Sequence, residues 1–416
     1  MNIFIVLAAI SLFACSTSKE NNKDEKSYYF DSNISRDVLE NYLSRSFTYS
    51  ELLTVDPYCN DGRYPDKDKD IELIKNTNAK FIGRSIYRWG NEDVLNNPDF
   101  WDSAENIIHQ IHANDTEVIF QAAVFEAVYK DGVNSIPVPE WTFVSLDLPI
   151  EKRNFSYDMM LNDEGKFVNH WGENASVPDI TKVETQLWFM FLIGSYVDIG
   201  IEAIHLGQVA LIGMNDPELN VWNSFLQKVR KVANKKARRN YVIFDAHTPQ
   251  GGMVVNGVSL LDFNSFPLRI KEIEDEPIKG KLEMGYLDSM YGRSMGCIAP
   301  SGWSCESLPY LVEFDNFGIG DNPGKPNVES HTIWGYDEIS WFFLLSREYQ
   351  AEWLNYAHNW LNENDKNAFL QMPGARVVTT ASEKQPKNGN FRAIAPTKNT
   401  PQGADLEDVI KKIWNK

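Results

Sequence analysis

The chain has 416 residues, of which 43% are hydrophobic and 12% aromatic, so it can bury a sizeable core in one large domain or two ordinary ones. The formal net charge of -18 disfavours a protein that binds the phosphate backbone of nucleic acids, so we expect no nucleic-acid partner.

The N-terminal segment has the pattern of a targeting signal. An apolar run covers residues 3–14 and is too short to span a bilayer. It ends in Leu12-Phe13-Ala14-Cys15, which resembles the lipobox of bacterial lipoproteins. The resemblance implies that 1–14 is a signal peptide and that Cys15 is lipidated. An ordinary cleaved secretion signal is the alternative, because no Lys or Arg precedes the run.

Both readings export the protein. With the lipobox, residues 15–35 form the lipidated Cys and a flexible tether. The expected location is then the outer membrane, on its periplasmic or cell-surface side. The lipid anchor would be the one contact with the membrane.

The first half of the chain alternates between strand and helix patterns. Asn97-Pro98 is a strong helix start, with Asn as N-cap and Pro as the first helical residue. Residues 127–180 read as a long insertion rich in Pro, Trp, Asn and Gly. The expected strands are 42–49, 80–87 and 118–125, and the expected helices are 70–78 and 98–111.

The alternation continues beyond the insertion. Thr181-x-x-Glu184 resembles a capping box, and the helix after it is apolar on all sides from Leu187 to Ile193, which predicts burial. From 250 to 330 the helical patterns fade and loops dominate. The remaining expected elements are strands 201–207, 241–246, 281–287, 310–315 and 331–336, and helices 222–232, 339–362 and 406–414.

About eight strands alternating with helices favour a parallel sheet, and eight units favour its closure. We therefore expect an α/β fold, a (β/α)8 TIM-type barrel over residues 36–365 with long loops and the insertion after strand three. Residues 366–416 would be a C-terminal extension that packs on the barrel.

Acidic residues stand at the ends of several expected strands. In the stretch from Tyr310 to Gly318, side chains alternate, so Leu311, Glu313 and Asp315 share one face. Cleavage of a glycosidic bond needs two carboxyl groups facing each other across the bond. Crowding should raise the pKa of Glu313 or Asp315, and Glu126, Asp245 and Asp288 could supply the opposing carboxyl.

An exported, Trp-rich, acidic barrel resembles the (β/α)8-barrel glycoside hydrolases that polysaccharide-degrading bacteria export as lipoproteins. In the largest clan of these enzymes an Asn-Glu pair ends strand four and a Glu ends strand seven. This chain has His205-Leu-Gly-Gln208 at the fourth position and Glu313 or Asp315 at the seventh. The resemblance therefore implies a poly- or oligosaccharide hydrolase but identifies no specific family.

The resulting site has a catalytic and a binding group. The catalytic candidates are Glu313, Asp315, Asp245 and Glu126. The substrate-binding candidates are Arg84, Trp89, His205, Gln208, His247, Asp288 and Trp334.

Other readings remain open. Glu313 could form a structural ion pair with Arg84, and Asp245 could form a hydrogen-bonded core pair with His247. The protein could be a surface lipoprotein that binds glycan without cleaving it. It could also be a metal-dependent hydrolase built on Asp245 and His247, with Glu126 or Asp288 as a third ligand.

The cysteines bear on cofactors. No Cys/His cluster has the spacing of a zinc site, and we expect no cofactor. Cys297 and Cys305 lie close in sequence, so in an oxidising compartment they form either a disulfide or two free thiols.

Overall fold

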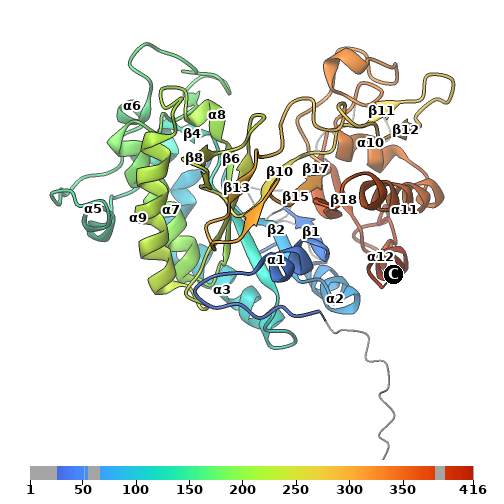
Figure 1. Cartoon of the computed structure of the whole chain (residues 1–416), viewed down its shortest axis with the longest axis horizontal. Coiled ribbons are helices and arrows are strands. Elements are labelled where there is room, and N and C mark those ends of the chain that lie inside the picture. The colour runs from blue at the N-terminus through green and yellow to red at the C-terminus, as the bar shows by residue number, and fades with distance from the viewer. Residues whose placement is uncertain (1–25, 51, 55–65, 380–388, 416) are drawn as a thin grey trace, which may run out of the picture.

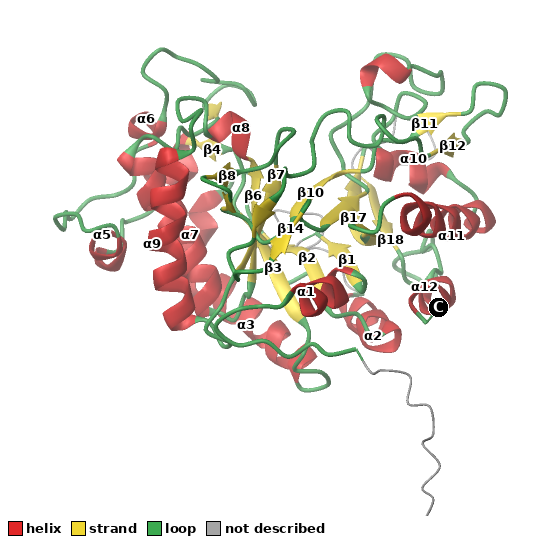
Figure 2. Cartoon of the chain, viewed as in Figure 1, coloured by secondary structure: helices red, strands yellow, loops and turns green. Residues whose placement is uncertain are grey.

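The computed structural model describes residues 26–50, 52–54, 66–379 and 389–415. The expected signal peptide, Cys15 and most of the tether lie outside these ranges. Strands occupy the centre of the molecule and helices flank them (Figures 1 and 2). None of the helices in the described ranges is long and apolar enough to cross a membrane.

The strands at the centre belong to two sheets. The larger has the order β18-β17-β1-β2-β3-β6-β7, in which neighbours are parallel except β17 and β18. The smaller has the parallel order β10-β15-β16. Their bounds are β1 Ser46–Tyr49, β2 Phe81–Ile86, β3 Ile119–Ala123, β6 Ala203–Gln208, β7 Ile243–His247, β10 Asn264–Pro267, β15 Tyr310–Glu313, β16 Ala368–Leu370, β17 Met372–Val378 and β18 Gly389–Arg392.

The two sheets adjoin at both sides. On one side, β16 of the smaller sheet continues through Gln371 into β17 of the larger sheet. On the other, the Asp262 N–H, just before β10, donates to the Phe244 carbonyl of β7 at 2.8 Å, and the Phe244 N–H donates to the Asp262 carboxylate. Within the described residues β7 and β10 form no strand ladder, so the two sheets are not joined by a continuous ladder on this side.

Helices follow most of the larger sheet's strands. Asn97 caps α3 as predicted, since its side chain accepts the Asp99 N–H. The helices of eight or more residues are α1 Arg36–Leu43, α2 Lys67–Thr77, α3 Pro98–His112, α7 Val183–Asp198, α9 Asn220–Lys236, α11 Arg347–Asn364 and α12 Glu407–Trp414.

The loops contain shorter helices and strands. Residues 127–180 do form a long insertion after β3, and they contain β4, α4, α5, α6 and β5. The short helices are η1 Glu92–Asn96, α4 Lys130–Asn134, α5 Glu140–Ser145, α6 Tyr157–Met160, α8 Val209–Ile212, η2 Val328–Ser330 and α10 Glu338–Leu344. The short strands are β4 Val128–Tyr129, β5 Ala175–Ser176, β8 Val254–Val255, β9 Val258–Ser259, β11 Lys271–Glu272, β12 Gly280–Lys281, β13 Cys297–Ile298 and β14 Ser304–Cys305.

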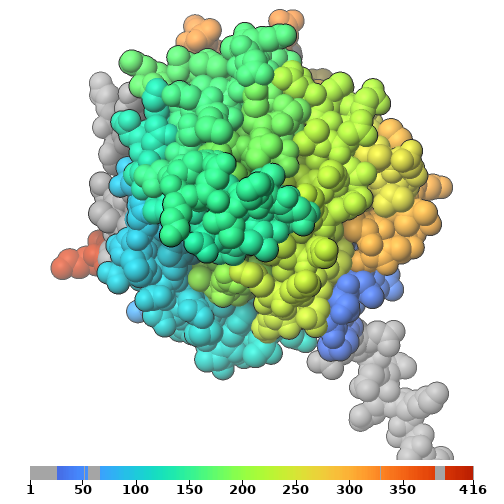
Figure 3. Space-filling view, turned by 90° about the vertical axis from the view of Figure 1, so that its left-hand side faces the viewer, coloured from blue at the N-terminus to red at the C-terminus, as the bar shows by residue number. Residues whose placement is uncertain are grey.

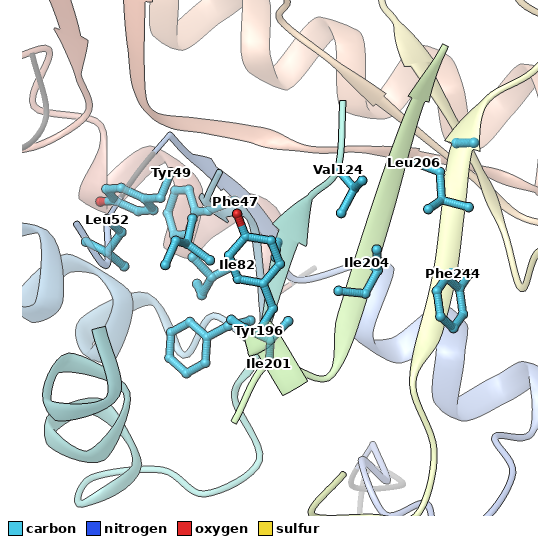
Figure 4. Packing of buried hydrophobic residues seen from close by; sticks show 14 of the residues in the cluster. Phe47, Tyr49, Leu52, Ile82, Val124, Tyr196, Ile201, Ile204, Leu206 and Phe244 are labelled. Atoms are coloured by element: carbon cyan, nitrogen blue, oxygen red, sulfur yellow. The ribbon is translucent and has the colours of Figure 1, made fainter. Parts of the chain in front are cut away.

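Each strand buries one face against the helices. In β6 and β7, Ile204, Leu206 and Phe244 belong to the large apolar cluster that includes α3, α7 and α9 (Figure 4). The outer surface on the left-hand side of Figure 1 is made largely of residues from the 127–240 part of the chain (Figure 3). The stretch Leu187–Ile193 is buried there, as its all-round apolar pattern predicts.

The opposite, inner face of the strands has a second apolar cluster at their amino-terminal ends. Phe81, Ile119, Ala203 and Ile243 are the first residues of β2, β3, β6 and β7, and they join Leu311 of β15. Residues of α1, among them Leu39 and Tyr42, complete this cluster and close the inner face at that end. Since side chains alternate along a strand, polar residues farther along the same face point into the interior toward the carboxyl ends.

The structure corrects three predicted strands. Residues 281–287 contribute only Lys281 to β12, and 331–336 hold turns and bridges rather than a strand. Their places are taken by β10 and by the β16–β17 stretch. The expected boundary at 365 therefore falls before strands that complete both sheets. Residues 42–49 divide between the end of α1 and β1.

Two helix predictions are also corrected. Lys182 precedes α7 and no side chain caps it, because Glu184 instead binds Arg153 and accepts the Ser156 N–H. The capping box is therefore wrong. The expected helix 339–362 is interrupted at Leu345 and Ser346, where Ser346 caps α11. The other predicted helices, including 406–414, are confirmed as to position.

Candidate active site

A layer of polar side chains lies on the inner face directly above the apolar cluster. Each comes from a different strand or from the Gln371 junction, so residues far apart in sequence meet. The layer contains Thr48, Gln121, His205, Asp245, Ser265, Glu313 and Gln371. Six of these seven side chains make a hydrogen bond to another member, and Glu313 instead binds Arg84 and His247.

Arg84 and Glu313 form a buried ion pair. The Arg84 Nε donates to Glu313 Oε2 at 2.9 Å and its Nη2 binds Glu313 Oε1, while His247 Nε2 lies 3.3 Å from the same oxygen. Burial alone would raise the pKa of Glu313, but the positive charge of Arg84 holds that pKa well below its usual value. Glu313 is therefore an ionised partner of Arg84, which was one of the open readings.

Arg84 adopts a strained backbone to reach this position. Its φ is +55°, in the left-handed region that costs a non-glycine residue about 1–3 kcal/mol. The register of β2 against β3 shifts between Ile82 and Ile86, and the Arg84 N–H donates to the Gln121 side chain instead of the ladder. Tertiary contacts therefore fix this side chain against local preference.

Asp245 lies at the centre of a separate hydrogen-bond network. Gln121 Nε2 donates to its Oδ1 at 2.6 Å, Ser265 Oγ donates to its Oδ2 at 2.5 Å, and His205 Nδ1 lies 2.8 Å from the same Oδ2. Burial raises the pKa of Asp245 to about 7 and lowers that of His205 well below its usual value. Burial therefore disfavours a charge on either partner, and Asp245 is bound to His205 rather than to His247.

A pocket of about 570 Å³ opens at the carboxyl ends of the strands above these networks. Its walls combine aromatic rings, three arginines and two carboxylates. Trp89 packs edge-on against Phe125 and Trp171. The lining residues are Arg84, Tyr87, Trp89, Phe125, Glu126, Trp171, Gly207, Gln208, His247, Arg269, Met290, Tyr291, Asp315, Asn316, Phe317, Ser330, His331 and Arg376.

Glu126, which follows β3, is one of the two carboxylates. The Gln208 N–H donates to its Oε2 at 2.9 Å and the Gln208 side-chain amide donates to its Oε1 at 2.7 Å. The Tyr291 hydroxyl donates to the side-chain oxygen Oε1 of Gln208 at 2.8 Å, which fixes the orientation of that side-chain amide. Gly207 has φ +61°, and a Cβ there would clash with Glu126 Oε2, so only glycine permits this approach.

Asp315, just beyond β15, is the other carboxylate. Arg376 of β17 binds its Oδ1, and the same guanidinium lies 4.0 Å from Glu313. Burial would raise the pKa of Asp315, but the Arg376 charge lowers it below its usual value. Asp315 is therefore ionised at the pocket wall. The predicted rise in the pKa of Glu313 or Asp315 is wrong, because each has its own arginine.

The structure brings together most of the predicted site residues. Trp89, Gln208, Glu126 and Asp315 line the pocket with Arg84 and His247, and Asp245, His205 and Glu313 lie beneath it. Two predicted residues are elsewhere. Asp288 accepts the Gly285 N–H in its own loop, and the indole of Trp334 donates to the Lys279 carbonyl away from the pocket lining.

Arg376, Arg269 and Tyr291 are pocket residues that the sequence patterns did not indicate. Arg376 lies in a segment interpreted as an extension, although the apolar run around it, Ala375 to Val378, is a strand signal. Arg269 and Tyr291 stand in loop-like sequence without periodicity, where no pattern points to them. In the part of the chain that the structure describes, no group of three His, Cys, Asp or Glu side chains is arranged to hold a metal ion.

No protein-family model matches the sequence, and a search of curated proteins finds no match. Among solved structures, the chain is similar to a noncanonic maltogenic α-amylase from Thermotoga neapolitana, with 11% identity and a TM-score of 0.46 over 90% of this chain and 78% of that one. It is also similar to a β-glucuronidase from Ruminococcus gnavus, with 11% identity and a TM-score of 0.41 over 89% of this chain and 49% of that one.

A third similar structure is an α-galactosidase from Thermus thermophilus, at 14% identity and a TM-score of 0.34 over 56% of this chain and 46% of that one. The chain spans about half the length of the β-glucuronidase. All three names are those of glycoside hydrolases.

Proposed function

We propose that the protein is a glycoside hydrolase that cleaves a poly- or oligosaccharide in this pocket, with Asp315 and Glu126 as its carboxylate pair. One observation carries the proposal: two carboxylates from different strand ends line the same pocket as the aromatic rings Trp89, Trp171 and Phe125. Aromatic faces stack on sugar rings, and a carboxylate pair is what glycosidic cleavage requires.

The environments of the two carboxylates suggest different roles. Asp315 is kept ionised by Arg376 and suits the nucleophile or the base. Glu126, oriented by Gln208, would transfer the proton to and from the glycosidic oxygen. Glu313 and Asp245 would act beneath them, by holding Arg84 and His205. This assignment moves the reacting pair from Glu313 and Asp245 to the residues that substrate can reach.

The proposal extends to the fold and the location. The eight parallel strands would form the (β/α)8 barrel of such enzymes, with β7 and β10 at its least regular seam. The chain would be exported and held at the outer membrane by lipid on Cys15, where polymeric glycans are available. These statements rest on the strand order and on the N-terminal sequence.

The test starts with a screen of glycosides and polysaccharides for turnover, followed by Asp315→Asn and Glu126→Gln on the active substrate. We expect each variant to lose at least about a hundredfold in kcat. If Asp315 is a nucleophile, azide should restore part of the Asp315→Asn activity as a glycosyl azide. Asp288→Asn, outside the pocket, is the matched control. Full turnover by both pocket variants would contradict the assignment.

A second candidate function is glycan binding without cleavage. It is favoured by the position of the carboxyls whose pKa is raised: burial raises the pKa of Asp245 and Asp337 to about 7 and of Glu338 to about 8, yet none of the three lines the pocket. If Glu126 does not act as the general acid, the pocket would bind a glycan without cleaving it. Saturable binding of a glycan that is never cleaved would support this reading over the first.

A further inference from the structure

Three arginines line the pocket, and they differ in how their guanidinium groups are used. Arg84 directs its Nε and Nη2 at the two oxygens of Glu313, the side-on geometry in which a guanidinium holds a carboxylate. Arg376 directs its Nη2 at Asp315 and its Nη1 at Ser50. The Nη2 atoms of Arg84 and Arg376 therefore each bind a carboxylate of the protein itself.

Arg269 differs from Arg84 and Arg376 at its Nη2, although the Nε of Arg376 is also buried without a hydrogen-bond partner among the described residues. Arg269 is 3% exposed, and its Nη1 donates to Glu338 at 2.5 Å. Its Nε is buried without a hydrogen-bond partner among the described residues, and its Nη2 contacts the Met290 sulfur at 3.0 Å. A thioether is a weak acceptor, so the Nε–Nη2 edge of a buried cation lacks the oxygens that Arg84 has on the same edge.

The surroundings of this edge belong to the pocket. Phe317 lies under the Arg269 guanidinium with its ring centre 4.4 Å from Cζ, and Phe317 and Met290 both line the pocket. The Met290 side chain is 46% exposed, so it can move aside at little cost. Burial raises the pKa of Glu338 to about 8 against the opposing charge of Arg269, so Glu338 offsets that charge only in part near neutral pH. The Asp315 carboxylate is a second negative charge that acts on Arg269.

We propose that the sugar bound in this pocket is a uronic acid, whose carboxylate displaces the Met290 thioether and binds side-on to the Nε–Nη2 edge of Arg269. This inference rests on the pocket being the glycan site proposed above, and it specifies the class of sugar. A planar carboxylate matches the fork of a guanidinium, and a neutral hydroxymethyl group would leave the buried Nε unpaired.

Nitrophenyl glycosides test binding and cleavage separately. The probes are the 4-nitrophenyl glucuronides and galacturonides in both anomeric forms, the corresponding glucosides and galactosides, and their 6-sulfates. Binding is measured by calorimetry and cleavage by nitrophenolate release. We expect a uronide to bind at least tenfold more tightly than its neutral counterpart, and Arg269→Gln to weaken uronide binding about ten- to a hundredfold while neutral binding is unchanged.

Met290 supplies a matched pair of variants that leaves the buried ion pair intact. Met290→Glu places a carboxylate against the open edge of Arg269 and should abolish the preference for uronides. Met290→Gln, of the same length without the charge, should keep it. Arg230→Gln removes a partly buried arginine that pairs with Asp262 outside the pocket, and should leave the ratio of uronide to neutral binding unchanged.

The outcomes separate the two proposals. Uronides that bind through Arg269 but are not cleaved would support this inference and contradict the hydrolase. Cleavage of neutral glycosides, with no preference for uronides in the wild type, would overturn this inference and leave the hydrolase standing. Tighter binding of the 6-sulfates, equal loss of both ligands in Arg269→Gln, or identical behaviour of the two Met290 variants would also overturn it.

Discussion

Single residues in this site have roles that depend on their partners. Glu313 and Asp245 both stand on buried strands and both face the interior. Burial acts to raise the pKa of both carboxyls. Only Glu313 is bound by a guanidinium, and the net effect is that its pKa lies well below the usual value, while the pKa of Asp245 rises to about 7. A carboxylate on a strand therefore does not reveal its protonation state until its neighbour is known.

The Arg84–Glu313 ion pair should contribute to the stability of the folded protein. Glu313→Gln leaves the Arg84 charge buried without its partner and should cost about 3–5 kcal/mol of unfolding free energy at pH 7. Because the folded pKa of Glu313 is depressed below 4.5, its stabilisation is complete above pH 4.5 and is lost as the pH falls through the folded pKa.

The measurement is denaturant unfolding of the wild type and the variant between about pH 3 and pH 8, a range that includes the ordinary pKa of a glutamate. The difference in unfolding free energy should be constant in the upper part of the range and shrink in the acidic part. A difference that grows on acidification would contradict a depressed pKa. Glu283→Gln, at a surface salt bridge with Lys271, is the control and should leave the unfolding free energy nearly unchanged, because solvent screens that pair.

Elements differ in how far their sequences determine them. Helix α7 was predictable because an apolar stretch such as Leu187–Ile193 has no exposed face to offer. Strand β10, at four residues including a proline, is too short to show a period, and it exists because it pairs with β15. Its neighbour Arg269 was missed for the same reason.

Two substitutions in helix α7, one at a buried and one at an exposed position, should differ in their effect on stability. Trp188 is 2% exposed and contacts the rings of Phe155 and Phe191, so Trp188→Asp should cost about 4 kcal/mol or more, from lost packing and a buried unpaired charge. Val183→Asp is the control, since residue 183 is 51% exposed in the first turn, where the helix dipole favours an acid. Equal melting temperatures of the two variants would show that α7 is not a core helix.

The short strands β13 and β14 bear on the cysteine alternatives. Cys297 and Cys305 are register partners in an antiparallel pair, and their sulfurs are 3.8 Å apart as free thiols. Opposed residues in such a pair are close enough for a disulfide. If the protein is exported, as proposed above, we expect it to contain this disulfide, worth about 2 kcal/mol.

Alkylation and peptide mapping without reductant check this expectation. Burial raises the pKa of Cys297 to about 11, so the thiolate is scarce and spontaneous oxidation should be slow without an exchange partner. Protein taken from an oxidising compartment should resist alkylation at both positions until it is reduced. Free thiols at both positions in that sample would make the prediction wrong.

For the whole molecule, the organising feature is the pair of adjoining parallel sheets, which the chain completes only near its end. The stretch 368–378 lies between β15 and β1 and carries Arg376 into the pocket. A truncation at 365 would therefore remove strands from both sheets and one of the three pocket arginines.

The location of the whole molecule is predicted to depend on Cys15. Cys15→Ala should abolish lipid attachment and leave soluble or unprocessed protein, because the lipobox cysteine is the acceptor of the lipid. Labelling with a radioactive fatty acid, followed by membrane fractionation, measures it. Label that persists in the variant would contradict the lipobox, while secretion of both forms without label would favour an ordinary cleaved signal.

The sequence by itself determined the elements whose information is local. Asn97-Pro98 starts a helix, an all-round apolar stretch is buried, and alternating strands and helices indicate parallel sheets. The polar residues at strand ends were also visible, because side-chain alternation assigns them to a face.

Only the tertiary structure decided which of those residues meet. Arg84 and Glu313 are 229 residues apart, and nothing in either segment specifies the other as its partner. The same holds for Asp315 with Arg376, and for Arg269 with Glu338. The physical reason is that a charge buried in a low-dielectric interior responds to whatever lies within a few ångströms, and neighbours at that distance are set by the packing of distant strands.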